Sequence, residues 1–244
     1  MSDGPHVVIA IDGPAASGKS STAQWVAEEL GYRHVDSGAL YRGVTAARLD
    51  SGGGGAVDGW TDESLLEAAQ RVGVRPREAS FGILVDGSDA EERIRDESVT
   101  RAVSAVATRA PVRDWVNARV RELAAGSSVV VDGRDMGTAV FPAADLKIFL
   151  VADPWERARR RLLQRLGRHP TQEEIAGETE RLVQRDARDA TQTVQARDAV
   201  LVDTTYLTQR EQVDRIVALA RAVSAADRGA GEGVNAGEID TSPS

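Results

Sequence analysis

The sequence predicts an α/β fold with a central parallel sheet, because short apolar strands alternate with amphipathic helices along the chain. The 244 residues, 41% hydrophobic and 28% charged, suffice for one large domain or two small ones. Residues 7–11 form a β-branched apolar run, typical of a strand buried on both faces. A glycine-rich loop and a helical pattern follow directly. The chain therefore opens as strand, loop and helix.

Helical spacing of apolar side chains predicts that this first helix covers residues 19–30, and Gly31 follows where a helix commonly ends. Further strands are predicted at 129–131, 146–152 and 199–202. Asp153 and Pro154 are typical of a helix start, and Thr208 begins a capping box that opens the last helix. This alternation favours parallel strands joined by right-handed crossovers.

The middle of the chain has a different pattern. Residues 72–74 and 83–85 predict two short strands of a small antiparallel sheet, and two helices are expected after them, the second starting at Pro111. The stretch 154–198 is rich in arginine and contains a capping box at 171–174. Residues 224–244 lack large apolar side chains, which predicts a disordered tail.

Composition excludes several classes of protein. Cysteine is absent, so disulfides, thiolate zinc sites and a cysteine nucleophile are excluded. The net charge of −8 argues against broad binding of nucleic acid. No apolar run approaches the roughly 18 residues of a membrane helix, and the first residues lack the features of a secretory signal. We therefore expect a cytoplasmic monomer without nucleic-acid or membrane partners.

Residues 13–20, here called the phosphate loop, fit the pattern G-x-x-x-x-G-K-[ST]. Its glycines let backbone N–H groups face phosphate oxygens, and the following helix presents its positive end. Lys19, one of only two lysines in the chain, is expected to neutralise the β- and γ-phosphates, and Ser20 to hold Mg²⁺. The sequence thus predicts a site for a nucleoside triphosphate, formed by Gly13, Pro14, Ala15, Ala16, Ser17, Gly18, Lys19, Ser20 and Ser21.

Two glycine-containing motifs indicate where a second substrate binds. Residues 36–42 open a helix, and residues 132–138 leave the carboxyl end of a predicted strand, where ligands of parallel sheets collect. The chain lacks the Asn-Lys-x-Asp stretch of guanine switches and the repeats expected of a mechanical ATPase. A small-molecule kinase is the leading interpretation.

Residues 36–42, 132–138 and 203–205 resemble the signatures of bacterial cytidylate kinases, and the similarity runs from about residue 7 to residue 223. The resemblance implies a P-loop kinase three-layer fold that transfers the γ-phosphoryl group of ATP to CMP or dCMP with Mg²⁺. It also implies a core of residues 1–37 and 126–223, a monophosphate-binding region at 38–125 with a small antiparallel sheet, and a helical lid within 154–198.

The same resemblance implies roles for individual residues. Catalytic roles fall to Lys19, Arg134 and Arg185, and CMP binding falls to Ser37, Arg42, Ser104, Arg113, Arg134, Asp135 and Asp189. Asp132 would assist Ser20 with the metal. Gln192 departs from the family, which usually has an arginine there; either a neighbour such as Arg188 substitutes, or acceptor binding is weaker.

Three alternatives remain open. The acceptor could be UMP or AMP. It could instead be a hydroxyl metabolite such as shikimate, for which Asp36 or Asp135 would act as the base. The third alternative is a binding module that ATP merely switches.

Overall fold

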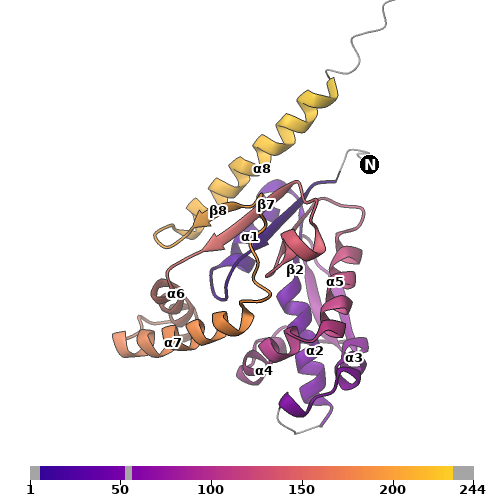
Figure 1. The fold of residues 1–244 in the computed structure, drawn as a ribbon, viewed down its shortest axis with the longest axis vertical. Helices are drawn as coiled ribbons and strands as arrows, with labels where there is room; N and C mark the ends of the chain where they lie inside the picture. Colours follow the sequence, from indigo (N-terminus) through magenta and orange to yellow (C-terminus); the bar gives the residue numbers. More distant parts are fainter. Residues whose placement is uncertain (1–5, 53–56, 233–244) are drawn as a thin grey trace, which may run out of the picture.

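A five-stranded parallel sheet forms the centre of the computed structural model, which describes residues 6–52 and 57–232 (Figure 1). The strand order is β2-β6-β1-β7-β8. The strands are β1 (Val8–Asp12), β2 (Arg33–Asp36), β6 (Val129–Asp132), β7 (Leu146–Val151) and β8 (Val200–Asp203). Because β1 is central and the chain continues to strands on both of its sides, the loop after β1 lies where such sheets bind ligands.

Side chains alternate between the two faces of this sheet. Ile9 and Ile11 pack against α1 (Lys19–Leu30) and α8 (Gln209–Glu232), whereas Ala10 between them faces the opposite layer. That layer contains α2 (Ser37–Asp50) and α5 (Ala110–Ala124). All three strand side chains are fully buried. The predicted three-layer α/β fold is therefore confirmed.

A second, antiparallel sheet packs on α2. It comprises β3 (Val72–Pro76), β4 (Phe81–Val85) and β5 (Ser88–Asp89), and α3 (Asp62–Gln70) and α4 (Glu97–Ala107) lie nearby. These elements share one hydrophobic cluster with a face of the central sheet. Gly43 of α2 allows this close packing, since a Cβ there would lie 3.0 Å from side-chain carbons of Val72 and Ile83.

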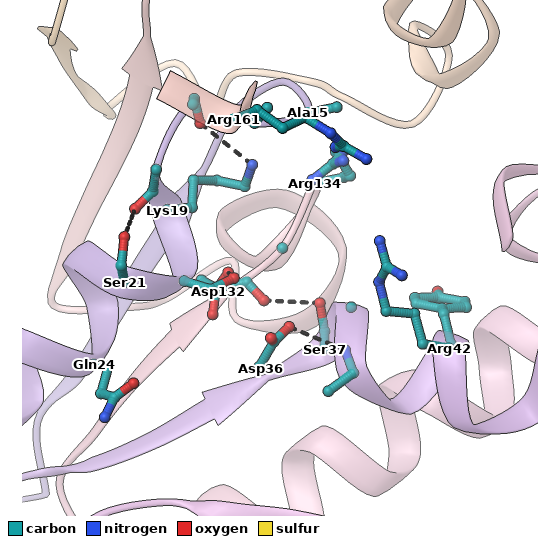
Figure 2. A pocket seen from close by; sticks show the side chains of 18 of the residues that line it. Ala15, Lys19, Ser21, Gln24, Asp36, Ser37, Arg42, Asp132, Arg134 and Arg161 are labelled. Carbon is teal, nitrogen blue, oxygen red and sulfur yellow. Dashed lines mark hydrogen bonds between the residues drawn. The ribbon is translucent and has the colours of Figure 1, made fainter. Parts of the chain in front are cut away.

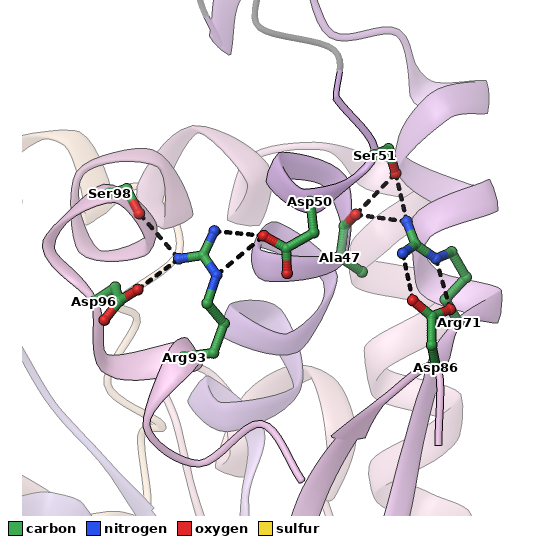
Figure 3. Close-up of polar contacts among 8 residues, drawn as sticks. All are labelled: Ala47, Asp50, Ser51, Arg71, Asp86, Arg93, Asp96 and Ser98. Carbon is green, nitrogen blue, oxygen red and sulfur yellow. Dashed lines mark hydrogen bonds and ion pairs between the residues drawn. The ribbon is translucent and has the colours of Figure 1, made fainter. Parts of the chain in front are cut away.

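Two arginines fix the C-terminal end of α2 (Figure 3). Arg71 donates to the carbonyl of Ala47 at 2.7 Å and pairs with Asp86. Arg93 donates from Nε and Nη2 to Asp50 at 3.0 and 2.7 Å. A helix end leaves carbonyls unsatisfied, so the contact from Arg71 anchors the helix whose other end reaches the site.

The arginine-rich stretch forms α6 (Pro154–Leu166) and α7 (Gln172–Asp189), which pack against each other. Both predicted starts are confirmed. The carboxylate of Asp153 accepts the N–H groups of Trp155 and Glu156, and Thr171 and Glu174 form a reciprocal capping box. Helix α7 also contacts α4, which packs on α2, so the α6–α7 pair lies next to the part of the molecule that carries the small sheet.

The predicted disordered tail is wrong at its start. Helix α8 continues to Glu232, so residues 224–232 are helical, and residues 233–244 lie outside the described part. Alanine, a strong helix former, occurs at 225, 226 and 230, so a helix can continue here without large apolar side chains.

Candidate active site

One cleft of about 1270 Å³ opens at the carboxyl ends of β1, β2 and β6. Figure 2 shows Lys19, Asp132, Ser37 and Arg134 grouped there, with Arg42 further along α2. The lining includes the phosphate loop, the first turns of α2, residues 132–135, parts of α4 to α7, and residues 205–209 up to the start of α8. Its volume exceeds what a single small ligand needs, so the cleft has room for two substrates.

The phosphate loop turns sharply away from β1. Gly13 has φ +146°, and a Cβ there would lie 2.2 Å from the carbonyl oxygen of Leu150. Gly18 has φ +86° and precedes the first turn of α1. Both positions therefore require glycine. The positive end of α1 consequently faces the cleft, as a phosphate site needs.

Lys19 is 6% exposed, and its Nζ donates to the carbonyl of Pro14 at 2.6 Å. Burial, together with the charge of Arg134, lowers its pKa well below the ordinary value. An arriving polyphosphate would relieve both effects. Seven of the nine residues predicted to bind the triphosphate line the cleft, and the other two, Gly13 and Pro14, are not among the described lining residues. The carbonyl of Pro14 nevertheless reaches the site, because it accepts the hydrogen bond from Lys19.

Ser20 and Asp132, the predicted metal residues, lie together. Ser20 Oγ donates to Asp132 Oδ2 at 2.7 Å, and the other carboxylate oxygen lies 2.7 Å from His34 Nε2. A hydroxyl and a carboxylate are the hard oxygen ligands that Mg²⁺ prefers, so the pair fits this ion. His34 was not predicted as a site residue. Burial lowers its pKa, but the hydrogen bond and charge of Asp132 outweigh this, and the pKa is raised.

The predicted acceptor residues come from four parts of the chain. Ser37 and Arg42 lie on α2, Ser104 on α4, Arg113 on α5, and Asp135 follows β6. Arg42 Nη1 donates to Ile94 O and Thr100 Oγ1, both at 3.0 Å. Arg113 forms an ion pair with Asp135. All five line the same cleft, although they are up to 98 positions apart in sequence.

Arg134 and Arg185 converge on Asp189. Each Nε lies 3.6 Å from Asp189 Oδ2, and within the described chain neither Nε has a hydrogen-bond partner. Burial and the proximity of Arg134 lower the pKa of Arg185 to about 10. Two half-buried guanidinium groups that share one carboxylate each keep a buried Nε donor unused, which suits an anionic ligand.

Gln192 lines the cleft at the end of this cluster. Arg188 lies away from this position: it is exposed, donates to Gln184 O at 3.3 Å, and is outside the described residues that line the cleft. Arg161 of α6 does line the cleft, and its charge contributes to lowering the pKa of Arg42 and of Arg185.

Asp12, at the end of β1, was also missed. Its two carboxylate oxygens accept the N–H groups of Met136 and Gly137, each at 2.8 Å, and so hold the segment after β6. Burial raises the pKa of Asp12 to about 6, despite these hydrogen bonds. Only its place at a strand end next to the phosphate loop could have indicated the role.

Comparison with protein families matches residues 9–222 to cytidylate kinase. The chain belongs to the cytidylate kinase family. The match covers the sheet, the small antiparallel sheet and the α6–α7 pair.

Relatives that bear this name are similar over most of their length. The cytidylate kinase of Geobacillus kaustophilus is 42% identical over 219 residues, which is 87% of this chain and 95% of the relative. That of Streptomyces griseus is 41% identical over 223 residues, 87% of this chain and 92% of the relative. Among solved structures, a shikimate kinase from Bacteroides thetaiotaomicron has a TM-score of 0.48 and 14% identity, covering 88% of this chain and 98% of that one.

In residues 6–52 and 57–232 of this cytidylate kinase family member, no helix has the length and apolarity to span a membrane.

Proposed function

We propose that the protein transfers the γ-phosphoryl group of ATP to CMP and dCMP, forming CDP and dCDP. The observation that carries this proposal is one cleft with a buried lysine in a phosphate loop on one side and a separate set of arginines on the other. Membership of the cytidylate kinase family supports the identity of the acceptor.

The donor phosphates would lie on the phosphate loop. Backbone N–H groups at the start of α1 and the ammonium group of Lys19 would neutralise their charge. Ser20 and Asp132 would hold Mg²⁺, which, when bound, neutralises and orients the donor phosphates.

The acceptor phosphate needs alignment more than a base. Its second pKa is near 6, so at neutral pH it is mostly a dianion that can attack without losing a proton. Arg42, Arg134 and Arg185 would hold it in line with the donor. The positions of their side chains around one space are consistent with this role.

Recognition of the base would fall to the polar groups beside α4 and α5. Ser104 is 7% exposed, and the pair formed by Arg113 and Asp135 presents fixed donors and acceptors beside it. Ser37 would contribute a hydroxyl, and Asp189 would contact the ribose. These assignments are the basis for preferring a pyrimidine.

A hydroxyl acceptor is less well supported. Its proposed bases are both engaged: Asp36 caps α2 by accepting the N–H of Ala39, and Asp135 pairs with Arg113. A binding module that ATP only switches would not require a second set of arginines.

We also propose that the protein is a cytoplasmic monomer without nucleic-acid partners.

The test is release of ADP from MgATP with CMP, dCMP, UMP, AMP and shikimate in turn. We expect the highest kcat/KM with CMP or dCMP and little ADP without an acceptor. Preference for UMP or AMP would overturn the base assignment. Preference for shikimate, or release independent of any acceptor, would overturn the proposal.

A further inference from the structure

Helices α6 and α7 hold the backbone of the phosphate loop at Ala15. Arg157 of α6 donates from Nη1 to the carbonyl of Ala15 at 2.7 Å. Asp186 of α7 accepts the N–H of Ala15 at 3.2 Å. The two side chains also pair with each other, with Arg157 Nη2 2.7 Å from Asp186 Oδ2. Both polar groups of the residue are thus bound by one ion pair that bridges two helices.

The methyl group of Ala15 is held by the same helices. Ala15 is 2% exposed and belongs to the small hydrophobic cluster of Ala158, Leu162, Ile175 and Leu182, which is the core between α6 and α7. A residue of the phosphate loop therefore completes the core of a different part of the molecule.

The next residue in the loop is strained. Ala16 has φ +57°, a left-handed conformation that costs a residue with a Cβ about 1 kcal/mol or more. Such a conformation persists only where surrounding contacts impose it. Ala16 itself packs against the α6–α7 core, and Arg157 and Asp186 bind the backbone of its neighbour Ala15.

We infer that Arg157 and Asp186 are positioning residues that hold the phosphate loop in its donor-binding shape and fix α7 in register with it. Asp186 directly follows Arg185 and lies one helical turn before Asp189. The contact that shapes the loop on the donor side thereby also places the two α7 side chains on the acceptor side.

This role is indirect. Among the described residues, those that line the cleft include Ala15 but not Arg157 or Asp186. Arg157 is 3% exposed and donates from Nε to Ala152 O at 3.1 Å, which fixes its own orientation. Any effect of either side chain on a bound nucleotide is therefore indirect, through the phosphate loop or through α7.

The inference rests on the proposed function, because it requires that the phosphate loop binds ATP.

The test uses calorimetric titration of the full chain with MgATP and, separately, with CMP. Asp186→Ala removes the acceptor and the charge, and we expect the Kd for MgATP to rise about tenfold. Asp186→Asn keeps an acceptor for Ala15, and a smaller rise of about threefold is expected. The Kd for CMP alone should rise less than that for MgATP in both variants, because only Arg185 and Asp189 of its proposed contacts stand on α7, and the contacts on α2, α4 and α5 are untouched.

A double variant separates positioning from stability. Arg157→Met with Asp186→Leu fills the site with apolar atoms and leaves no buried unpaired charge, so folding should be retained. We expect its Tm near the wild-type value and its Kd for MgATP still raised about tenfold. Arg168→Gln is the matched control, since it removes an ion pair between the segment that joins the two helices and Glu174 of α7, at 2.6 Å, away from the phosphate loop.

The outcomes are distinct. Wild-type protein that does not bind MgATP would overturn the proposed function. Wild-type protein that binds, with a double variant that binds equally well, would overturn only the positioning role. An equal loss for CMP and MgATP would likewise contradict it.

Discussion

Lys19 is buried and Arg185 half-buried, and the pKa values of both cations are lowered by burial and by the same neighbour, Arg134. Each cation is costly in the absence of an anion, because charge has been removed from water beside like charge. Bound phosphates would offset that cost on both sides of the cleft. At the scale of residues, the site is therefore arranged for two phosphate-bearing ligands.

Lys19→Ala tests the donor side. We expect kcat/KM to fall about 10³-fold or more, because a charge proposed to contact the transferring phosphoryl group is lost. The fold should be retained, since the variant removes a desolvated cation. Steady-state kinetics and thermal unfolding measure the two effects. Turnover close to wild type in a folded variant would contradict the assignment of Lys19.

Gln192→Arg tests the acceptor side. A guanidinium group at this lining position should lower the KM for CMP, by roughly tenfold or more for one added charge-assisted hydrogen bond. Gln195→Arg adds the same charge at an exposed position outside the described lining and serves as control. Equal changes in both variants would show that only overall charge matters.

Asp12 gives the stability a defined pH dependence. Burial raises its pKa from 3.8 to about 6, so between these values the folded protein keeps a proton that the unfolded chain has released. The stabilising contribution of Asp12 to the free energy of unfolding is therefore greatest below pH 4. It is lost as the pH rises toward 6, and the loss amounts to about 3 kcal/mol at most.

Asp12→Asn removes this titration. The free energy of unfolding of the wild type minus that of the variant should fall between pH 4 and pH 6, measured by urea unfolding at each pH. A difference that stays constant or rises would contradict the raised pKa.

At the scale of elements, a helix or strand could be predicted from the sequence where its apolar pattern was clear and its ends were marked by residues such as glycine. Helix α1 lies at the predicted residues 19–30, because a glycine bounds each end of its apolar pattern. The segments α3 and β5 were not predicted; β5 has only two residues, both exposed, so it carries no apolar pattern. The contacts of Asp12 and His34 were missed because pairing between distant strands leaves no trace in local sequence.

The capping box of α7 can be tested directly. Thr171→Ala removes the side chain that accepts the N–H of Glu174 at 3.2 Å, so we expect a loss of about 1 kcal/mol in stability. Thr179→Ala on the same helix is the control, because that hydroxyl only donates to a carbonyl already within the helix. Urea unfolding measures both. Equal stability of the two variants would show that the cap is not formed.

At the scale of the whole molecule, the parts of the cleft belong to different hydrophobic cores. The arginines and serines proposed for CMP stand mostly on elements of the large cluster that includes α2, α4 and α5, whereas Arg161 and Arg185 stand on the α6–α7 pair. Ala15 joins that pair to the phosphate loop. We expect the two parts to approach when both substrates bind, which would exclude water from the transfer.

Direct observation of the products tests the central claim. Phosphorus NMR of the full chain with Mg²⁺, ATP and CMP should show CDP and ADP appearing in equal amounts, with little inorganic phosphate. If ADP and inorganic phosphate accumulate together while CMP stays unchanged, the protein hydrolyses ATP, and phosphoryl transfer to the pyrimidine nucleotide is contradicted.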